Sequence, residues 1–505
     1  MPKLGLETHV VDNNVYKNSV KRFKDAGIIL PSFAELADPS QIPQSITQAL
    51  VDVDPGAAAS LNLFRVHWFN EAGGRGTQKI PDHIVLPKSL TGVSARIIVL
   101  FGDLFPMIQT HKVLAAYGCL APRIITGQFD PITHRAVWPS TGNYCRGGVA
   151  ISKIMGCRGV AVLPAGMSRE RFQWLENWVM EPEDIIKTPG SESNVKEIYD
   201  KCNELDADAQ NIIFNQFCEF GNSLSHYLCT GRAMESVYET AAGTRPGSRL
   251  RAFVASSGSA GTLAAGDYLK EKFGSLTAVV EALECPTILY NGFGEHNIQG
   301  IGDKHIPFIH NVMKTDLAMA VSEVSTDALN VLFNTKTGRD YLVERKEIPW
   351  SVVEALGRFG LSSICNIMAA VKIAKHYDMG PDDVIMTVAT DGAELYRTER
   401  DKVLKETYST GFSDLDAAEV FGRDLMGITT DHLLELSHLD RQRIFNLGYY
   451  TWVEQQGVTI EEFTARRENH FWTGLRELIP VWDEMIAEFN SKTGLRKSTG
   501  AESKV

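Results

Sequence analysis

The sequence predicts an α/β protein with mostly parallel sheets, and three features carry this prediction. From about residue 95 onward, short apolar, β-prone runs alternate with helix-like segments. Several of the strand-like runs lead directly into loops of glycine and hydroxyl residues, and a helical segment follows. The chain of 505 residues is also too long for one ordinary domain and long enough for a large buried core.

The expected elements follow one another in a regular order. The expected strands are ARIIVLF (95–101), CRGVAVLP (157–164), RLRAFVAS (249–256) and VIMTVAT (384–390), and VWPS (137–140) leads into a loop. The expected helices are MIQTHKVLAAYG (107–118), which should stop at Gly118, GGVAISKIMG (147–156) and LAAGDYLKEKF (263–273). Most of these residues are expected to form the core of the protein.

The two ends of the chain lack this alternation of strand-like and helix-like segments. Residues 1 to about 90 are expected to be irregular, because polar residues, proline and glycine interrupt them, as in DVDPGAAAS. From about residue 430 the pattern is helical, and Thr459 and Glu462 have the spacing of a capping box. Apolar residues near one helical face predict a packing or oligomer contact; they are Trp472, Leu475, Leu478 and Ile479. The tail at 491–505 is expected to be disordered.

Composition excludes several classes of function. The formal net charge of −12 argues against a nucleic-acid partner, which would require clustered Lys and Arg. No run of 18 apolar residues is present and the first residues lack a signal-peptide core, so neither a membrane partner nor export is expected. Eight scattered cysteines without a CxxC pair argue against a metal site and a disulfide scaffold, and a cytoplasmic location is expected.

Two loops rich in glycine and hydroxyl residues are the candidate binding elements, PSTGNYCRGG (139–148) and SSGSAGT (256–262). A loop of this kind between a strand and a helix places backbone N–H groups at a helix N-terminus, where phosphate or carboxylate binds. Neither loop is a Walker or dinucleotide motif. Ordinary turn chemistry remains the alternative interpretation of each loop taken alone.

Seven segments, in order over about 300 residues, resemble the cysteine synthase family of fold-type II enzymes. The segments are FPMIQTHKV (105–113), PSTGNY (139–144), LPAGMSRERFQWLE (163–176), FNQFCEFGNSLSHYLCTGR (214–232), SSGSAGT, HNIQGIGDKHIPF (296–308) and VATDGAELY (388–396). The second segment resembles the family's asparagine loop, and SSGSAGT resembles its phosphate-binding Gly-Thr-Gly-Gly-Thr loop. One segment alone would be a weak signal, but seven in the family's order are a strong one.

The resemblance implies pyridoxal 5′-phosphate (PLP) as the cofactor and assigns residues to it. Lys112 is expected to form the Schiff base with PLP and then to carry a proton. Asn143 is expected to bond the 3′-oxygen of the cofactor. Thr390 is expected to bond the pyridine nitrogen, with Asp391 as the alternative partner. The phosphate is expected to lie against Gly258, Ser259, Ala260, Gly261 and Thr262.

The substrate residues are expected in and around the asparagine loop. The resemblance assigns the substrate's α-carboxylate to Ser140, Thr141 and Gln216. Tyr144 and Arg146 stand where the family has other residue types, so the pocket that recognises the substrate side chain should differ from that of an O-acetylserine enzyme. Arg146 would pair with a second anionic group on the substrate.

The activity implied by the resemblance is β-replacement through an enzyme-bound aminoacrylate, in which an activated serine exchanges its leaving group for a nucleophile. A β-elimination lyase that releases pyruvate and ammonia is the alternative, and the sequence does not separate the two. A non-catalytic relative that binds PLP or an amino acid is disfavoured, because the lysine, the asparagine and the phosphate loop are all present.

The resemblance also implies an architecture like that of the tryptophan synthase β-subunit, with two three-layer α/β domains and the cofactor in the cleft between them. Residues 91–114 and 236–430 are expected to form the large PLP-binding domain, and residues 115–235 a small mobile domain. Residues 1–90 and 431–505 are expected to be extensions, the second one helical. A homodimer is expected.

Overall fold

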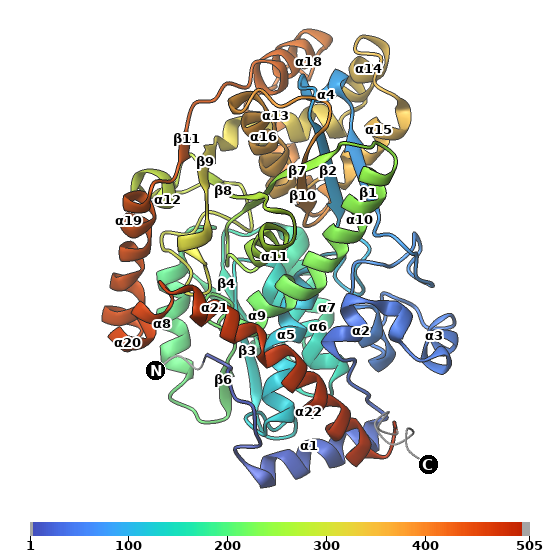
Figure 1. The fold of residues 1–505 in the computed structure, drawn as a ribbon, viewed down its shortest axis with the longest axis vertical. Helices are drawn as coiled ribbons and strands as arrows, with labels where there is room; N and C mark the ends of the chain where they lie inside the picture. The colour runs from blue at the N-terminus through green and yellow to red at the C-terminus, as the bar shows by residue number, and fades with distance from the viewer. Residues whose placement is uncertain (1–3, 497–505) are drawn as a thin grey trace.

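The structure, a computed structural model, describes residues 4–496 and contains two sheets surrounded by helices (Figure 1). The strands are β1 (His83–Leu86), β2 (Arg96–Phe101), β3 (Arg135–Pro139), β4 (Arg158–Pro164), β5 (Ile185–Thr188), β6 (Asn211–Ile213), β7 (Arg249–Ser256), β8 (Leu276–Ala282), β9 (Leu317–Val321), β10 (Asp383–Ala389) and β11 (Leu433–Glu435). The seven-stranded sheet has the order β1-β2-β10-β7-β8-β9-β11, and the four-stranded sheet has the order β5-β4-β3-β6.

Most neighbouring strands are parallel, as the sequence predicted. In the large sheet only the two edge strands, β1 and β11, run antiparallel to their neighbours. Every pair in the small sheet is parallel. The expected strands coincide closely with β2, β4, β7 and β10, because long apolar, β-branched runs are buried on both faces of a parallel sheet.

Helices cover both faces of each sheet. They are α1 (Asn13–Ala26), α2 (Phe33–Ala37), α3 (Gln44–Leu50), α4 (Lys88–Thr91), α5 (Lys112–Ile125), α6 (Asn143–Ile154), α7 (Arg169–Trp178), α8 (Val195–Leu205), α9 (Phe220–Ser225), α10 (Gly231–Gly243), α11 (Leu263–Phe273), α12 (Thr287–Tyr290), α13 (Glu323–Asn334), α14 (Lys336–Glu344), α15 (Trp350–Ala355), α16 (Leu361–His376), α17 (Arg397–Glu406), α18 (Asp414–Phe421), α19 (His438–Tyr449), α20 (Ile460–Ala465), α21 (Asn469–Arg476) and α22 (Leu478–Thr493). In the large sheet, Ile98 and Leu100 face the core shared with α5 and α11, whereas Ile97 and Val99 face the core shared with α16. This alternation produces the expected three layers.

The predicted end of one helix at Gly118 is wrong. The helix, α5, begins at Lys112 because Met107 and Gln109 have positive φ angles, and it continues to Ile125. A Cβ at Gly118 would lie 2.5 Å from the carbonyl oxygen of Gly221. The glycine therefore allows a close crossing of α5 and α9 and does not end the helix.

The prediction that residues 1–90 are irregular is also wrong in part. The helix α1 spans 14 residues between an N-cap, Asp12, whose carboxylate accepts from two backbone N–H groups, and Gly27, which is left-handed at φ 66°. Both signals are present in the sequence, so this helix was predictable.

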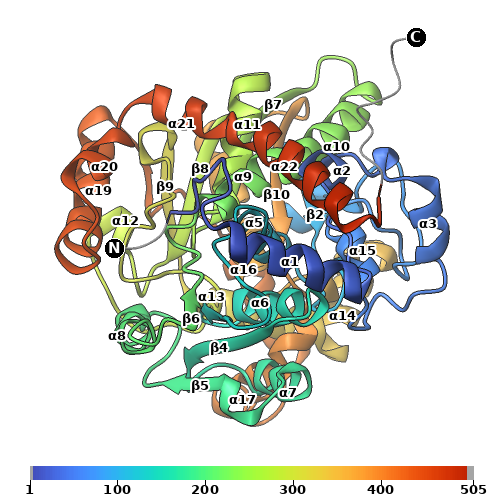
Figure 2. The same cartoon turned by 90° about the horizontal axis from the view of Figure 1, so that it is seen from below.

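The two terminal extensions pack against each other and against α5 (Figure 2). The rings of Phe23 in α1 and Phe489 in α22 meet edge to face at 5.2 Å. The side chain of Asn490 accepts from the N–H of Leu30 and donates to its carbonyl oxygen. The predicted capping box at Thr459 is confirmed. The extensions thus support the helix that carries Lys112.

The boundaries of the expected domains remain predictions. The small sheet lies within residues 115–235, while the large sheet also includes β1 and β11, from outside the expected large domain. Of the expected disordered tail, residues 497–505 lie outside the described residues, and α22 includes the first three residues of the rest. Within residues 4–496, every helix is too short or too polar to cross a membrane. All eight cysteines are buried and unpaired.

Candidate functional site

One pocket collects the loops that follow the carboxyl ends of β3, β7 and β10. This is the usual position of a ligand site in parallel sheets. The lining residues are His111, Lys112, Ser140, Thr141, Asn143, Tyr144, Gln216, Phe217, Ser256, Gly258, Ser259, Ala260, Gly261, Thr262, Gln299, Gly300, Ile301, Asp303, Ser362 and Thr390. The pocket thus brings together twelve of the fourteen residues predicted for the site, from parts of the chain up to 278 positions apart.

The SSGSAGT loop forms one wall, at the N-terminus of the 11-residue helix α11. A Cβ at Gly258 would lie 2.4 Å from the carbonyl oxygen of Gly300, and one at Gly261 would lie 2.2 Å from Oδ1 of Asn222. Ala260 has a φ angle of 64°, a strained conformation for a residue other than glycine. The loop is therefore held in a specific shape at the N-terminus of α11, where the first backbone N–H groups of a helix have no partner within the helix.

Lys112 is the first residue of α5, and its amine faces this loop. Nζ lies 3.3 Å from Oγ of Ser259. Burial lowers the pKa of the Lys112 amine to about 8, although the negative charge of Asp303 opposes the shift. A larger share of this amine is consequently neutral, and hence nucleophilic, at neutral pH than in an exposed lysine.

The asparagine loop forms the opposite wall, at the N-terminus of the 12-residue helix α6. Gly142 has a φ angle of 153°, and a Cβ there would lie 2.6 Å from the side chain of Arg171. The N–H of Gly142 donates to Oγ of Ser140 at 3.0 Å. Oε1 of Gln216 is buried without a hydrogen-bond partner among the described residues. The N-terminus of α6, which follows β3 of the small sheet, and the N-terminus of α11, which follows β7 of the large sheet, therefore face one pocket.

The other two predicted site residues, Arg146 and Asp391, lie behind Asn143 and outside the lining. Arg146 donates to Oδ1 of Asn143 at 3.0 Å and to the carbonyl oxygen of Ile108 at 3.1 Å. Nδ2 of Asn143 donates to Asp391 at 2.6 Å. These buried charged residues hold the Asn143 amide from both of its ends.

Thr390 and Asp391 differ in their access to the pocket. Thr390 lines it, and its hydroxyl lies 3.1 Å from Nε2 of His111. Burial keeps the pKa of His111 well below its ordinary value, so this imidazole is neutral. Asp391 instead accepts hydrogen bonds from Asn143 and from the hydroxyl of Tyr396 at 2.8 Å. Ser362, which the sequence analysis missed, also lines the pocket, at the start of α16.

The sequence analysis also missed the charged residues around the asparagine loop. Arg171 in α7 donates to the hydroxyl of Tyr396 at 2.8 Å and to Gln299, and its guanidinium lies 3.7 Å from Asp391. Arg171 therefore connects α7, the helix after β4, to the segment that contains Gln299 and to the segment that follows β10 and contains Asp391 and Tyr396. Glu192, in the loop before α8, is also buried. Both lie in polar stretches that resemble ordinary surface segments, and nothing in the sequence marks them as buried.

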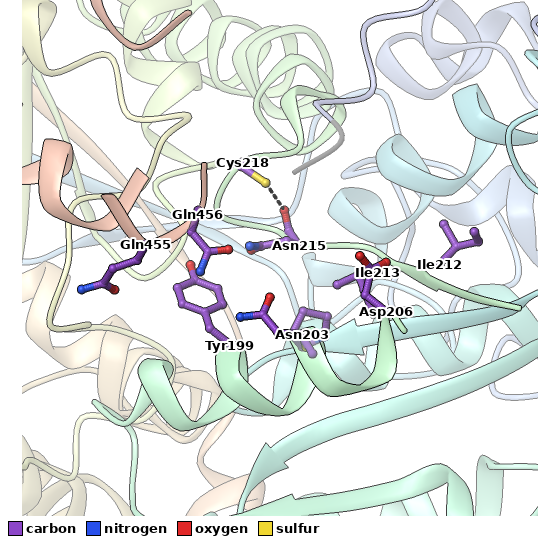
Figure 3. Close-up of a pocket in the computed structure, with 11 residues that line it drawn as sticks. Tyr199, Asn203, Asp206, Ile212, Ile213, Asn215, Cys218, Gln455 and Gln456 are labelled. Atoms are coloured by element: carbon purple, nitrogen blue, oxygen red, sulfur yellow. Dashed lines mark hydrogen bonds between the residues drawn. The ribbon is translucent and has the colours of Figure 1, made fainter. Parts of the chain in front are cut away.

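A second pocket lies beside Asn215 and Cys218, the two residues that flank Gln216 and Phe217 in the sequence (Figure 3). It is lined by Pro139, Tyr199, Cys202, Asn203, Asp206, Ile212, Ile213, Asn215, Cys218, Gln455 and Gln456. No lysine or arginine lies among these residues. An anionic cofactor would find no counter-charge there, so the first pocket is the candidate site.

Comparisons with known proteins agree with this choice of fold. No family model matches the chain. Cysteine synthase B of Campylobacter jejuni is 31% identical over 255 residues, which cover 49% of this chain and 74% of the relative. A probable cysteine synthase of Bacillus subtilis is 29% identical over 265 residues, which cover 51% of this chain and 75% of the relative.

Solved structures share the fold at lower sequence identity. An O-acetylserine dependent cystathionine beta-synthase from Helicobacter pylori superposes with a TM-score of 0.51 at 20% identity and covers 63% of this chain and 94% of its own. A cysteine synthase from Entamoeba histolytica has a TM-score of 0.52 at 19% identity and covers 68% of this chain and 94% of its own. The uncovered part of this chain is consistent with the additional extensions.

Proposed function

The chain belongs to the cysteine synthase family of fold-type II enzymes, and we propose that it uses PLP to replace a group on the β-carbon of a serine- or cysteine-type amino acid. The observation that carries this proposal is the meeting of Lys112 with Ser259 in a pocket that two helix N-termini face. One terminus would bind the cofactor phosphate and the other the substrate carboxylate.

The residues of the pocket fit this cofactor. Gly258 and Gly261 leave no room for a side chain, so backbone N–H groups and the hydroxyls of Ser259 and Thr262 can approach a phosphate closely. The Lys112 amine is near enough to the loop for one small cofactor to contact both. The strained backbone at Ala260 supports a binding role, since strain of this kind collects at functional sites.

When bound, PLP supplies an electron sink that makes the α-proton acidic and lets a β-substituent depart. Lys112 would hold the cofactor covalently and then take the α-proton, a role that suits an amine with a pKa of about 8. Ser140, Thr141 and Gln216 would orient the α-carboxylate. Asn143, whose amide is held by Arg146 and Asp391, would position the pyridine ring of the cofactor relative to Lys112 and the carboxylate-binding residues.

Thr390 is our choice for the partner of the pyridine nitrogen. It lines the pocket, whereas Asp391 does not. A neutral hydroxyl, with the neutral His111 beside it, would leave the ring nitrogen unprotonated. A weaker electron sink of this kind suits chemistry at the β-carbon. Arg146, which the sequence analysis placed at a second anionic group of the substrate, is proposed here as a positioning residue for Asn143.

β-Elimination to pyruvate and ammonia remains the second candidate, because both reactions share their first steps. Product analysis of the purified enzyme with serine, cysteine and O-acetylserine tests the proposal, with and without an added thiol. Replacement predicts a new amino acid that contains the thiol, with little pyruvate. Pyruvate as the main product in both conditions would assign the enzyme to the lyases.

The quaternary structure and cellular location are part of the same proposal. A homodimer in the cytoplasm, with residues 115–235 closing over the substrate, is expected from the family. Light scattering on the purified protein tests the dimer. A mass of about one chain of 55.8 kDa would contradict it.

A further inference from the structure

Two buried acids border the candidate site and have no role in the chemistry proposed so far. Asp303 lines the pocket and is only 6% exposed. Among the described residues, no group donates a hydrogen bond to its carboxylate. The carboxyl group opens onto the pocket near the charge of Lys112 and has room for a hydrogen-bond partner in the working state. In this pocket that partner would be the substrate.

Glu192 is the second acid, and it is 1% exposed. Neither of its carboxylate oxygens has a hydrogen bond of regular geometry among the described residues, although the Thr141 hydroxyl and the backbone of Gly300, both in the pocket lining, lie near enough to lower its pKa. Burial raises the pKa of Glu192 to about 7, and the charge of Arg171 limits the rise. Burial also raises the pKa of Asp303 well above its usual range, with a further contribution from Glu192. Two acids that interact in this way favour the protonated form of one of them.

We propose that Asp303, supported by Glu192, gives a proton to the leaving group and takes one from the incoming nucleophile, so that the amino-acid substrate is free serine or cysteine and not an ester of serine. This inference rests on the proposed function. It makes Asp303 a catalytic residue of the same pocket, and it defines the class of leaving group.

The proton balance supports this choice. Lys112 takes the α-proton, the electrons of the α C–H bond form a Cα=Cβ double bond, and the electrons of the bond from Cβ to the substituent leave with the substituent. A hydroxyl or thiol group leaves readily only if it gains a proton, which the Asp303 carboxyl supplies to make water or hydrogen sulfide. The Asp303 carboxylate then accepts the proton of the next nucleophile as the new bond to Cβ forms.

Ester substrates do not need this arrangement. Acetate and phosphate leave as stable anions and require no proton. The groups that act on Asp303 are Lys112 of α5, Glu192 and, more remotely, Tyr199 of α8 and Cys285. Of these, only Lys112 is a cation.

Substitution of Asp303 by Asn separates the two substrate classes. With L-serine or L-cysteine, D303N should lose about 100-fold or more in kcat/KM, the usual contribution of a general acid. With O-acetyl-L-serine it should change by less than about threefold. The matched control is D267N, because Asp267 is also buried with a pKa raised to about 6, and its hydrogen bond within residues 4–496 is to Asn311, away from the pocket lining. D267N should affect all substrates alike.

The pH profile supplies a second readout. A general acid must be protonated, so kcat with serine should fall as pH rises through the pKa of Asp303, and kcat with O-acetylserine should lack this limb. The variant D303E should keep the limb at a shifted pH, and it serves if D303N does not fold. Equal losses with serine and O-acetylserine, or a wild-type enzyme that is active on the ester alone, would overturn the inference.

The proposed function fails in a distinguishable way. A wild-type protein that shows no visible PLP absorbance, or that turns over none of the three amino acids, would refute the function itself. If D303N retains the absorbance of bound PLP and the wild type retains activity, any failure belongs to the role of Asp303 alone.

Discussion

The lowered pKa of Lys112 predicts how fast the protein without cofactor takes up PLP at each pH. Only the neutral amine attacks the aldehyde of PLP. With the pKa of Lys112 lowered to about 8, about a tenth of this amine is neutral at pH 7. With the ordinary value of 10.5, only about 0.03% would be neutral. The structure therefore predicts about 300-fold more reactive amine at neutral pH, a difference due mainly to burial.

The assay is the second-order rate of PLP incorporation between pH 6 and 11, followed by absorbance. At each pH this rate is divided by the rate constant of the neutral amine of Nα-acetyl-lysine, which is its observed rate divided by its own neutral fraction, to remove the titration of PLP itself. The neutral fraction should rise about tenfold per pH unit up to a midpoint near the pKa of about 8 and then level off. A midpoint near 10.5 would refute the reasoning.

Two further predictions concern the walls of the pocket. G261A should weaken PLP binding at least tenfold in a fluorescence titration, because its Cβ would lie 2.2 Å from Oδ1 of Asn222, whereas G474A, whose Cβ meets no atom within 4 Å, should leave the Kd unchanged. R171M should lower the free energy of unfolding in urea by about 3–5 kcal/mol, because it removes the positive charge that faces the buried carboxylate of Asp391. The folded-state pKa of Asp391 is already raised and should rise further in R171M, so the loss should grow as pH increases from 4 to 8 and shrink in the double variant R171M/D391N. A pH-independent loss would contradict this account.

The strands and the two binding loops could be predicted because their signals are local. A buried parallel strand is a continuous apolar run, and SSGSAGT directly follows such a run, so β7, the loop and α11 appear in the sequence in that order. The start of α5 at Lys112 was harder to predict from the sequence, because it depends on positive φ angles at Met107 and Gln109, which are not glycines. The continuation of α5 through Gly118 depends on a crossing with a helix about a hundred residues later.

The charged surroundings of the site could not be predicted for a related reason. Burial of Arg171 and Glu192 follows from how segments far apart in the sequence come together around the asparagine loop. The polar neighbours of both residues in the sequence predict exposure to solvent instead of burial. Asp303 lies within a segment that resembles the family, but its unpaired carboxylate becomes evident only from the pocket that surrounds it. Proton-transfer groups of this kind require the three-dimensional structure.

The most direct test of the central claim is chemical mapping of the cofactor attachment site. The purified protein, supplied with PLP, is reduced with borohydride, digested and analysed by mass spectrometry, alongside K112A. The account predicts a visible band near roughly 410–420 nm before reduction, from a PLP imine, and a pyridoxyl group on Lys112 afterwards, with both absent from K112A. Attachment to another lysine, or no attachment with PLP in excess, would contradict it.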